Sequence, residues 1–219
     1  MQNLPRIYIN NKPKIGDKIP LLRDQSHYLT RVMRSEKCLV FNDGVEYEAS
    51  VTDKTLDIIR KTEHTDPTNK TIFYFAPIKQ SKMEEMLNAA TQMGVAVLQP
   101  VITDRTTERF PKWGRIEKII VEASEQSGRN SIPKLLPPIK FSELDKKDLV
   151  FADERFAHDD KENNKKINNY TSVLIGPEGG FSPAEFSTLD KSGAIAISLG
   201  KTILRAETAA VAALAKIII

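Results

Sequence analysis

Hydrophobic residues follow two different patterns along the chain. Up to about residue 68 they occur in short runs such as "RIYI", "CLVF" and "EYEASV", separated by the turn signals "NNKPKIGD" and "NDG". Such runs, rich in β-branched and aromatic residues, predict short strands. The stretch "FNDGVEYEASV" predicts a hairpin, because Asp43-Gly44 suits the positive φ angles of a tight turn. We therefore expect a small β-rich domain over residues 1–68.

Two other segments belong to this first part of the chain. "DQSHYLTRVMR" predicts a helix in which Tyr28, Leu29, Val32 and Met33 share one face. The polar stretch "TEHTDPTNK", residues 62–70, contains proline and no apolar run, so it predicts a linker.

From residue 69 onward, apolar runs alternate with amphipathic stretches. We expect strands in "TIFYFAPI", "VAVLQPV", "DLVFADE", "TSVLIG" and "AIAISLG", and helices in "SKMEEMLNAATQMG", "KWGRIEKIIVEASEQSG", "SPAEFSTLDKSG" and "AETAAVAALAKIII". Ser81 is the expected N-cap of the first helix, with Glu84 at its third position, and Gly94 and Gly128 are expected helix stops. Strands that are apolar throughout and alternate with helices predict a mostly parallel sheet covered on both faces. The sequence therefore predicts an α/β domain over residues 69–219.

Open α/β sheets bind ligands outside the carboxyl ends of their strands. The expected loops there are "ADERF", "GPEGG" and "LGKTILR". In the second loop, Gly176, Gly179 and Gly180 allow conformations that other residues avoid, and they let backbone groups approach a ligand. Ser182 and Glu185 then predict a capping box at the start of the next helix. These loops form the candidate ligand site; a tight strand-to-helix connection without a ligand is the alternative.

The spacing of these loops excludes two nucleotide sites. "GPEGG" lacks the G-x-G-x-x-G spacing of a dinucleotide site, and Glu178 stands where a pyrophosphate needs open amides. A Walker loop that ends in "GKT" at 200–202 would need glycine at position 195, which is Ile195. An NAD- or ATP-dependent metabolic enzyme fails on these spacings, and an absence of nucleotide binding would close that alternative. A ligand without phosphate fits better, and S-adenosylmethionine, with its adenosine, sulfonium cation and amino-acid tail, is one.

Charge and composition narrow the class of protein further. The formal charge of the 219 residues is only +3, but residues 1–40 hold eight Lys and Arg against three Asp and Glu. This basic start fits an acidic partner such as nucleic acid, or simply a solvated basic surface. Cys38 is the single cysteine, and the three histidines at 27, 64 and 158 show no ligand spacing, so no metal site is expected.

The ends of the sequence bear on where the protein works. "MQNLPRIYIN" lacks the apolar core of a secretory signal. "AAVAALAKIII" is too short to span a bilayer and contains a lysine. We therefore expect a cytoplasmic protein.

Two long motifs carry a resemblance to a known family. "LIGPEGGFSPAEF" together with "LGKTILRAETAAVAALA" resembles the RsmE family of SPOUT-class methyltransferases, which methylate N3 of a uridine in 16S ribosomal RNA. "DQSHYLTRVMR" and the block from "TERF" to "EASEQSGRNSIP" are similar to further family segments. The resemblance implies an N-terminal PUA-like β-barrel for RNA, a C-terminal α/β domain threaded as a trefoil knot, and a homodimer. The hairpin "SEKCLVFNDGVEYEASV" departs from the family pattern by being short, without the extra glycines expected there.

The resemblance also implies roles for single residues in methyl transfer. The uracil must lose its N3 proton, and charge that develops on the base must be stabilised. Arg205 is the first candidate for that stabilisation, with an ion pair to Glu207 as the structural alternative. Glu207 is a candidate proton acceptor, although a carboxylate near a helix start is favoured by the dipole alone. Thr208 is a candidate hydrogen-bond partner of cofactor or base.

Binding residues follow from the same motifs and from charge. By carry-over, the candidate cofactor residues are Ile175, Gly176, Gly180, Leu199, Gly200 and Leu204, with Asp153 and Glu154 added because they lie at a strand end. The candidate RNA contacts are Arg6, Arg23, Arg31, Arg34 and Arg129. Arg31 and Arg34 are three apart and share a face of the expected helix, so both could meet phosphates.

Two alternatives to this enzyme stay open at the level of sequence. One is an RNA-binding protein that keeps the fold without catalysis, against which the intact loops argue. The other is a methyltransferase of the same class that acts elsewhere on RNA, such as a ribose 2′-oxygen. The choice of uracil N3 comes from the resemblance alone.

Overall fold

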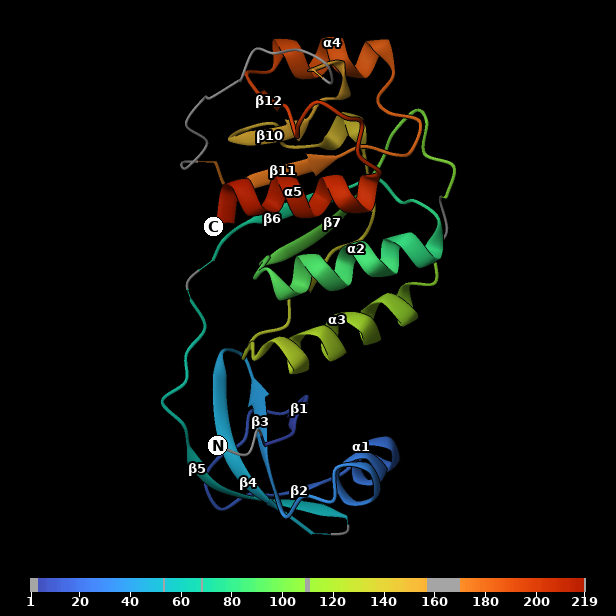
Figure 1. The fold of residues 1–219 in the computed structure, drawn as a ribbon. Coiled ribbons are helices and arrows are strands. Elements are labelled where there is room, and N and C mark those ends of the chain that lie inside the picture. The colour runs from blue at the N-terminus through green and yellow to red at the C-terminus, as the bar shows by residue number, and fades with distance from the viewer. Residues whose placement is uncertain (1–3, 53, 68, 109–110, 157–169, 219) are drawn as a thin grey trace. The chain divides into compact units, whose positions relative to one another are not determined.

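The chain divides into two compact units. The structure is a computed structural model that describes residues 4–52, 54–67, 69–108, 111–156 and 170–218 (Figure 1). Residues Met1–Thr68 and Val121–Ile132 make the first unit, and residues Asn69–Ile120 and Pro133–Ile219 make the second. The division at residue 68 coincides with the expected boundary. The sequence did not predict that residues 121–132 would join the first unit.

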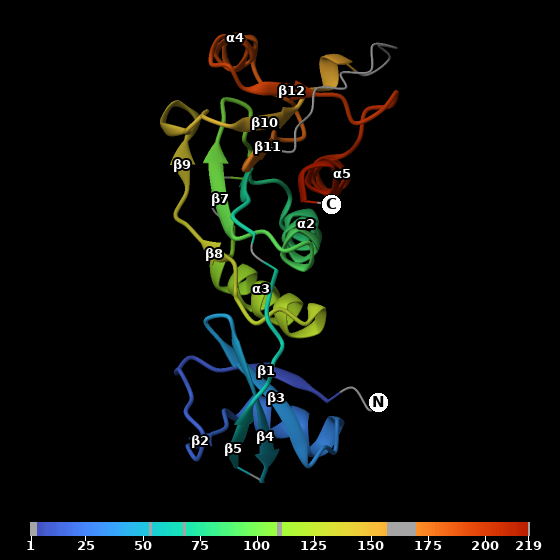
Figure 2. The same cartoon turned by 90° about the vertical axis from the view of Figure 1, so that its left-hand side faces the viewer.

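The first unit is built on a five-stranded sheet, shown in Figure 2. Its strands are β1 (Arg6–Tyr8), β2 (Lys18–Pro20), β3 (Lys37–Asn42), β4 (Val45–Val51) and β5 (Thr55–Lys61). The order is β1-β3-β4-β5-β2, with β1 and β3 parallel and the other pairs antiparallel. Within the described residues the edge strands β1 and β2 do not pair with each other. The expected PUA-like barrel is therefore a curled, open half-barrel.

The β3–β4 hairpin confirms the turn that the sequence predicts. Asn42 pairs with Val45, and between them Asp43 and Gly44 have φ of 50° and 77°. Two positive φ angles give a turn whose twist matches that of the flanking strands.

The helix expected in "DQSHYLTRVMR" differs from a regular α-helix. α1 spans Arg23–His27 and continues as a π-helical turn, η1 (Tyr28–Val32). In η1 only Leu29 is buried, while Val32 and Met33 are 60% and 42% exposed. The predicted shared apolar face is wrong, because the wider π turn breaks the 3.6-residue spacing on which it was based.

The segment expected as a linker is held by hydrogen bonds. The carboxylate of Asp66 accepts from the backbone N–H of Asn130 and from Oγ of Ser131, both at 2.6 Å. Nε2 of His64 lies 2.8 Å from the carbonyl oxygen of Gly128. Residues 64–66 and 128–131 therefore belong to one packed layer of the first unit.

The second unit has a parallel sheet with an inserted central strand. Its strands are β6 (Ile72–Phe75), β7 (Val97–Ile102), β8 (Lys134–Leu135), β9 (Ile139–Lys140), β10 (Leu149–Ala152), β11 (Ser172–Ile175) and β12 (Ile195–Ile197). The order is β12-β10-β11-β6-β7-β8. β9 pairs with the C-terminal end of β7, further along that strand than β8 does. The late strand β11 thus lies between β10 and the early strand β6. The predicted parallel α/β sheet is confirmed.

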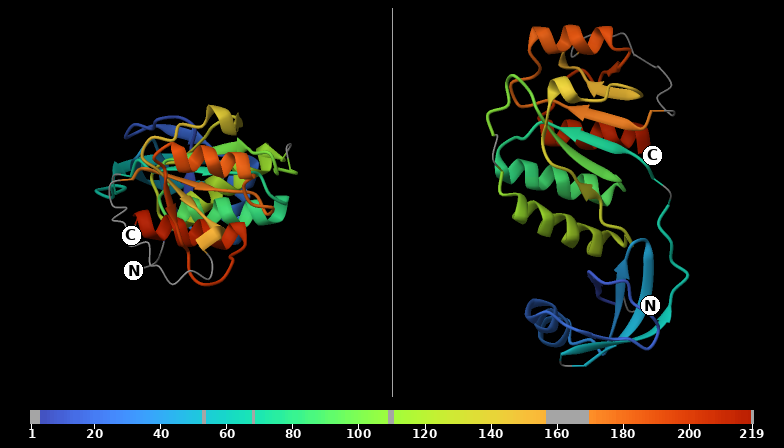
Figure 3. Two further views of the ribbon diagram at one scale, coloured as in Figure 1. Left: turned by 90° about the horizontal axis from the view of Figure 1, so that it is seen from above. Right: turned by 180° about the vertical axis from the view of Figure 1, so that it is seen from behind.

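Helices cover both faces of this sheet. They are α2 (Gln80–Gln92), α3 (Trp113–Ser127), α4 (Pro183–Lys191) and α5 (Ala206–Ile218), with 3₁₀ turns η2 (Phe141–Glu143) and η3 (Glu154–Phe156). α2 and α5 lie side by side against one face, and the rear view in Figure 3 shows the strands in front of α5. On the other face α4 packs into an aromatic cluster.

The start of α2 corrects one sequence expectation. The N-cap is Lys79 and not Ser81, so the helix begins two residues earlier than the capping-box pattern indicated. Glu84 instead accepts hydrogen bonds from Gln80 Nε2 at 2.9 Å and from Arg115 Nε at 2.6 Å. Gly94 follows the helix with φ of 92°, as expected of a glycine stop.

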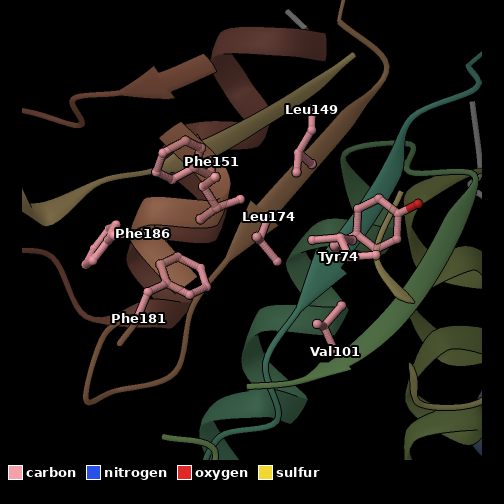
Figure 4. Close-up of a cluster of buried hydrophobic side chains, with 9 residues drawn as sticks. Tyr74, Val101, Leu149, Phe151, Leu174, Phe181 and Phe186 are labelled. Atoms are coloured by element: carbon pink, nitrogen blue, oxygen red, sulfur yellow. The ribbon is translucent and has the colours of Figure 1, made fainter. Parts of the chain in front are cut away.

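The aromatic cluster fixes α4 onto the sheet (Figure 4). Phe151 of β10 and Leu174 of β11 face Phe181 and Phe186, and Phe181 is only 2% exposed. The rings of Phe181 and Phe186 meet edge to face with centroids 5.5 Å apart. This packing positions the residues between β11 and α4, which the sequence identified as the candidate ligand loop.

The path of the chain leaves one implied feature as a prediction, the trefoil knot. α5 contacts α2, β10 and β11, as a threaded C-terminal helix would. These contacts alone do not establish that the chain passes through a loop. Within the described residues, no helix combines the length and the apolar character needed to cross a bilayer.

The first testable prediction concerns Cys38 in the core of the first unit. Burial raises the pKa of its thiol to about 12, and the side chain is fully buried among Val40, Leu56 and their neighbours. Because the thiolate is the reactive form, we expect no labelling by a thiol reagent at pH 8 in the native protein and complete labelling in urea. Rapid native labelling, followed by absorbance with time, would contradict the packing of this unit.

Candidate functional site

A cavity of about 600 Å³ lies at the carboxyl edge of the second unit's sheet. Its walls come from the loops that follow β10, β11 and β12, from the start of α5 and from the first turn of α2. These loops are distant in sequence and adjacent in space because β10, β11 and β12 are parallel neighbours. The position is the usual ligand site of an open α/β sheet, and the volume suits a small organic ligand.

The glycine-rich turn after β11 forms one wall. The N–H of Gly180 donates to the carbonyl oxygen of Pro177 at 2.9 Å, which closes the turn. Gly180 has φ of 68°, and a Cβ built there would lie 2.1 Å from Oε1 of Glu154. A Cβ at Gly176 would lie 3.0 Å from the ring of Phe181. Neighbouring atoms therefore crowd a side chain at both positions, and at Gly180 the positive φ disfavours one as well.

The other side of this turn is supported by the loop that follows β7. Arg105 Nη1 donates to the carbonyl oxygen of Gly179 at 2.8 Å. The buried carboxylate of Glu185 accepts from the N–H of Ser182 at 2.8 Å and from the N–H of Asp104 at 2.9 Å. The first of these bonds completes the capping box that the sequence predicts. One carboxylate therefore ties the turn, α4 and the β7 loop together.

An acidic wall follows β10. Glu154 lines the cavity against Gly180, and Asp153 lines it as well. The Asp153 carboxylate is fully buried and is bound by Arg155 through Nε at 2.9 Å and Nη2 at 2.6 Å. Arg155 also bonds Asp190 on α4 at 2.8 Å. The Asp153 carboxylate is therefore engaged in an ion pair. Glu154 is the other carboxylate that this loop presents to the cavity.

A cationic group lies at the opposite end, next to α2 and α5. Lys82 and Arg205 both line the cavity, and Lys82 Nζ is 2.7 Å from Glu85 and 3.8 Å from Oε1 of Glu207. The hydrogen bond to Glu85 raises the pKa of Lys82, and the nearby charge of Arg205 opposes that rise. Lys82 is thus held as a cation at neutral pH. Glu207 thus pairs with Lys82, whereas the sequence had raised a pair with Arg205 only as the structural alternative to a role in catalysis.

Comparison with known proteins gives the family. A family model described as an RNA methyltransferase domain matches residues 65–218. The "Ribosomal RNA small subunit methyltransferase E" of Rickettsia conorii is 33% identical over 236 residues, which cover 97% of this chain and 94% of that protein. The chain belongs to the ribosomal RNA small subunit methyltransferase E family. A member from Mesomycoplasma hyopneumoniae is also 33% identical, over 74% of this chain and 75% of its own.

Solved structures of similar proteins contain the methyl donor. The family member from Neisseria gonorrhoeae, bound to S-adenosylmethionine, matches with a TM-score of 0.83 at 26% identity over 97% of this chain and 95% of its own. A protein from Legionella pneumophila in complex with the same cofactor matches with a TM-score of 0.82 at 27% identity, over 97% and 96% of the two chains. The resemblance stated from the motifs is thereby confirmed at the level of family and fold.

The structure brings the family's predicted cofactor residues together. All eight of them line the cavity: Ile175, Gly176, Gly180, Leu199, Gly200, Leu204, Asp153 and Glu154. Arg205 and Glu207 line it too, whereas Thr208 is exposed on α5 and is absent from the wall. The role of each in binding or catalysis stays a prediction.

The predicted RNA contacts fall into two groups. Arg31 and Arg34 are exposed and line one open hollow on the first unit, and Arg23 is exposed at the start of α1. Arg6 is largely buried: Nη1 pairs with Glu46, and Nη2 donates to Oδ1 of Asn130 at 2.8 Å. These partners bind both terminal nitrogens of the guanidinium within the protein, so Arg6 acts as an internal support, and its position does not support the expected contact with phosphate.

Arg129 has an intermediate position. Its backbone carbonyl accepts from Arg6 Nη2 at 2.9 Å, and its own Nη2 lies 3.3 Å from Oγ of Ser131. Burial lowers the pKa of the Arg129 guanidinium from its usual value. Half-buried and bonded within its unit, Arg129 is less accessible to RNA than the sequence suggested.

The sequence missed two charged members of the site, Glu178 of the glycine turn and Lys82. The more distant one is Lys82. It lies in "KQSKMEE", far from both motifs, and reaches the cavity only because α2 packs beside α5. Its position on the first turn of α2, directly after a strand, was the signal that could have found it. Among the described residues, no three His, Cys, Asp or Glu side chains gather as a metal site; His158 lies outside those residues.

The second testable prediction compares two left-handed glycines of this unit. Gly180→Ala introduces backbone strain and a clash with Glu154, whereas Gly193→Ala, at φ of 82°, introduces the strain alone because nothing lies within 4 Å. Each strained residue should cost about 1–3 kcal/mol of unfolding free energy in urea melts. We expect a larger cost at Gly180, and the excess should disappear in the Gly180→Ala, Glu154→Ala double variant. Equal costs in both single variants would contradict the packing of Glu154 on Gly180.

Proposed function

We propose that this protein transfers the methyl group of S-adenosylmethionine to N3 of a uridine in 16S ribosomal RNA of the small subunit. The observation that carries the proposal is the cavity at the tips of β10, β11 and β12, whose walls contain both family motifs. The names of the relatives support the class of substrate, and the solved relatives support the donor. The exact nucleotide and the choice of N3 rest on the family resemblance.

The walls of the cavity fit this donor in three ways. Leu199 and Leu204 offer apolar surface for the adenine, and the glycine turn offers backbone groups close by. Glu154 offers acceptors for hydroxyl groups, as carboxylates at strand tips do for the ribose of other adenosine cofactors. The cavity holds no phosphate cradle, and S-adenosylmethionine requires none.

The chemistry asks for charge stabilisation at the base. In the proposed step the N3 proton leaves the uracil, a bond forms from N3 to the methyl carbon, and the carbon–sulfur bond breaks with its electron pair moving to sulfur. S-adenosylhomocysteine and the methylated uridine are the products. Arg205, with Lys82 beside it, is proposed to stabilise the negative charge on the uracil oxygens as the proton leaves. Glu207 is the candidate acceptor of that proton, and Thr208 a candidate contact of the base once RNA is bound.

RNA is proposed to bind the first unit at the exposed cations of α1 and η1. Arg31 and Arg34 share a hollow with Thr30 and Thr52, and Arg23 is exposed nearby in sequence. Arg34 has a left-handed backbone, with φ of 50°, at the end of the π-helical segment. Cations in this arrangement suit the phosphates of a folded RNA, which position it without reading its sequence.

The assembly and the location complete the proposal. In the alanine-rich helix α5 the side chain of Val211 is 40% exposed. In the loop before this helix the side chain of Ile203 is 69% exposed. An exposed apolar helix face of this kind fits the homodimer that the family resemblance implies. A cytoplasmic location is proposed because the small-subunit ribosomal RNA named for the relatives is made and assembled there.

The decisive experiment is a methyl-transfer assay. Small subunits or 16S RNA from cells that lack the modification are incubated with the protein and tritiated S-adenosylmethionine, and the modified nucleotide is mapped by mass spectrometry. The proposal expects one labelled uridine with the methyl group on N3. Label on a ribose 2′-oxygen would replace N3 by that acceptor, and donor binding without transfer would indicate a binding protein.

The third testable prediction concerns Arg205. Arg205→Ala should lower kcat by about 100-fold, the usual cost of removing one donor that stabilises charge in the transition state, with little change in donor affinity. The matched control is Lys201→Ala, which removes an exposed cation of the same loop that does not line the cavity. A kcat in Arg205→Ala equal to that of the control would remove Arg205 from the mechanism.

The fourth testable prediction concerns RNA affinity. The Arg31→Ala, Arg34→Ala double variant should weaken binding to a small-subunit RNA fragment and reduce the slope of log K against log salt by about one for each lost phosphate contact. The control removes Lys14 and Lys18, two exposed lysines of the same unit, and so changes the net charge equally. An identical salt slope for both double variants, measured by fluorescence anisotropy, would exclude the α1–η1 surface.

A further inference from the structure

Glu154 presents its carboxylate to the cavity from a very short element. η3 has three residues, Glu154–Phe156, directly after β10. Oε1 of Glu154 lies where a Cβ of Gly180 would be, so the carboxylate packs against the glycine turn. The carboxylate lines the cavity, and none of the hydrogen bonds or ion pairs found among the described residues involves it. A glutamate side chain has several rotatable bonds, and the backbone around it must therefore be held by other residues.

The next residue, Arg155, supplies a dense set of contacts on the other side of the chain. Its own N–H and Nε both donate to Oδ1 of Asp153 at 2.9 Å, and Nη2 donates to Oδ2 at 2.6 Å. Nη2 and Nη1 donate to the two carboxylate oxygens of Asp190 at 2.8 and 3.1 Å. The guanidinium carbon lies 4.0 Å from the ring centroid of Phe186. Such paired, bidentate bonds fix an arginine in one orientation.

Arg155 does not line the cavity. It lines a separate hollow with Phe186, Asp190 and Lys191, on the outer side of α4. Neighbouring residues of η3 thus face two different spaces, with Glu154 in the ligand cavity and Arg155 on α4. The guanidinium joins the tip of β10 to α4, where it bonds Asp190 in the last turn and lies over the ring of Phe186.

The glycine turn is joined to the same helix. Ser182, the N-cap of α4, bonds Glu185 in both directions, and Phe181 beside it packs on Phe186. Both partners of the contact between Glu154 and Gly180 are therefore held by α4, one through Arg155 and the other through the capping box. Loss of Arg155 would release Glu154 and leave the glycine turn in place.

We propose that Arg155 is a positioning residue for the methyl donor: by joining the β10 tip to α4, it holds the Glu154 carboxylate where the ribose hydroxyls of S-adenosylmethionine bind. The inference rests on the proposed function. It assigns control of donor affinity to a side chain that touches neither the donor nor the cavity. Asp190 and Phe186 take part by holding the guanidinium from the side of α4.

The fifth testable prediction measures donor affinity by isothermal titration calorimetry on the full chain. Arg155→Met alone would leave the buried Asp153 without its cation, so it is combined with Asp153→Asn, which removes both charges. Because Asp153 itself lines the cavity, Asp153→Asn alone is the reference. We expect the double variant to raise Kd for S-adenosylmethionine about 10-fold above that reference, which corresponds to about 1.4 kcal/mol. KM for the donor should rise by a similar factor, with kcat at saturating donor within about twofold of wild type.

A second variant and a control accompany it. Asp190→Asn keeps the bond between Arg155 and Asp153 and weakens only the link to α4, whose Asp190 side chain is 48% exposed, so the fold is retained. Its Kd should rise about threefold. Lys191→Met is the matched control, since it removes an exposed charge next to Asp190 on the same helix and should leave Kd unchanged.

A double-mutant cycle with Glu154 separates positioning from general destabilisation. If Arg155 acts through Glu154, its loss should raise Kd in the wild-type background and have almost no effect in Glu154→Gln, since coupled residues are not additive. A purely structural role would lower the melting temperature by the same amount in both backgrounds and shift Kd equally in both.

The outcomes distinguish this inference from the function on which it rests. Donor binding by the wild type together with unchanged Kd in the Arg155 and Asp190 variants, or additive effects in the cycle, would overturn the inference alone. No measurable binding of S-adenosylmethionine by the wild type would overturn the proposed donor and the inference together. A loss of affinity that vanishes in Glu154→Gln is the expected result.

Discussion

The insertion of β11 between β10 and β6 is the constraint on which the rest of the second unit depends. It places a late strand at the centre of the sheet, so that the loops after β10, β11 and β12 end at one edge beside the first turn of α2. Because parallel strands direct their carboxyl ends to the same side, this order alone gathers four distant segments around one space. The residues of these segments give the cavity an acidic wall, a glycine-rich wall and a cationic end.

Local chemistry made part of this arrangement predictable. The β3–β4 turn at Asp43-Gly44 and the capping box of Ser182 and Glu185 are encoded within a few residues, and both form as expected. The parallel sheet followed from uniformly apolar strands. The cofactor candidates line one cavity, and their roles stay a prediction because the geometry does not by itself assign them.

What the sequence could not supply depends on distant contacts. Lys82 enters the site through packing of α2 on α5, and the pairing of Asp153 with Arg155 and Asp190 requires β10 and α4 to be neighbours. Arg6 was expected to contact RNA because its charge was visible and its burial was not. The π turn at Tyr28–Val32 replaced a regular helix, since only Leu29 had a core position to fill. In each case tertiary context outweighed the local pattern.

The layer formed by residues 64–66 and 128–131 has a consequence for how the chain is made. The first unit needs residues 121–132 to satisfy Asp66, and Glu125 of the same segment accepts the N–H of Tyr8 in β1. A ribosome must therefore translate past β6, α2 and β7 before the N-terminal half-barrel has its last partners. Until then the nascent half-barrel is incomplete, so its folding waits for a segment that is made after the first elements of the second unit.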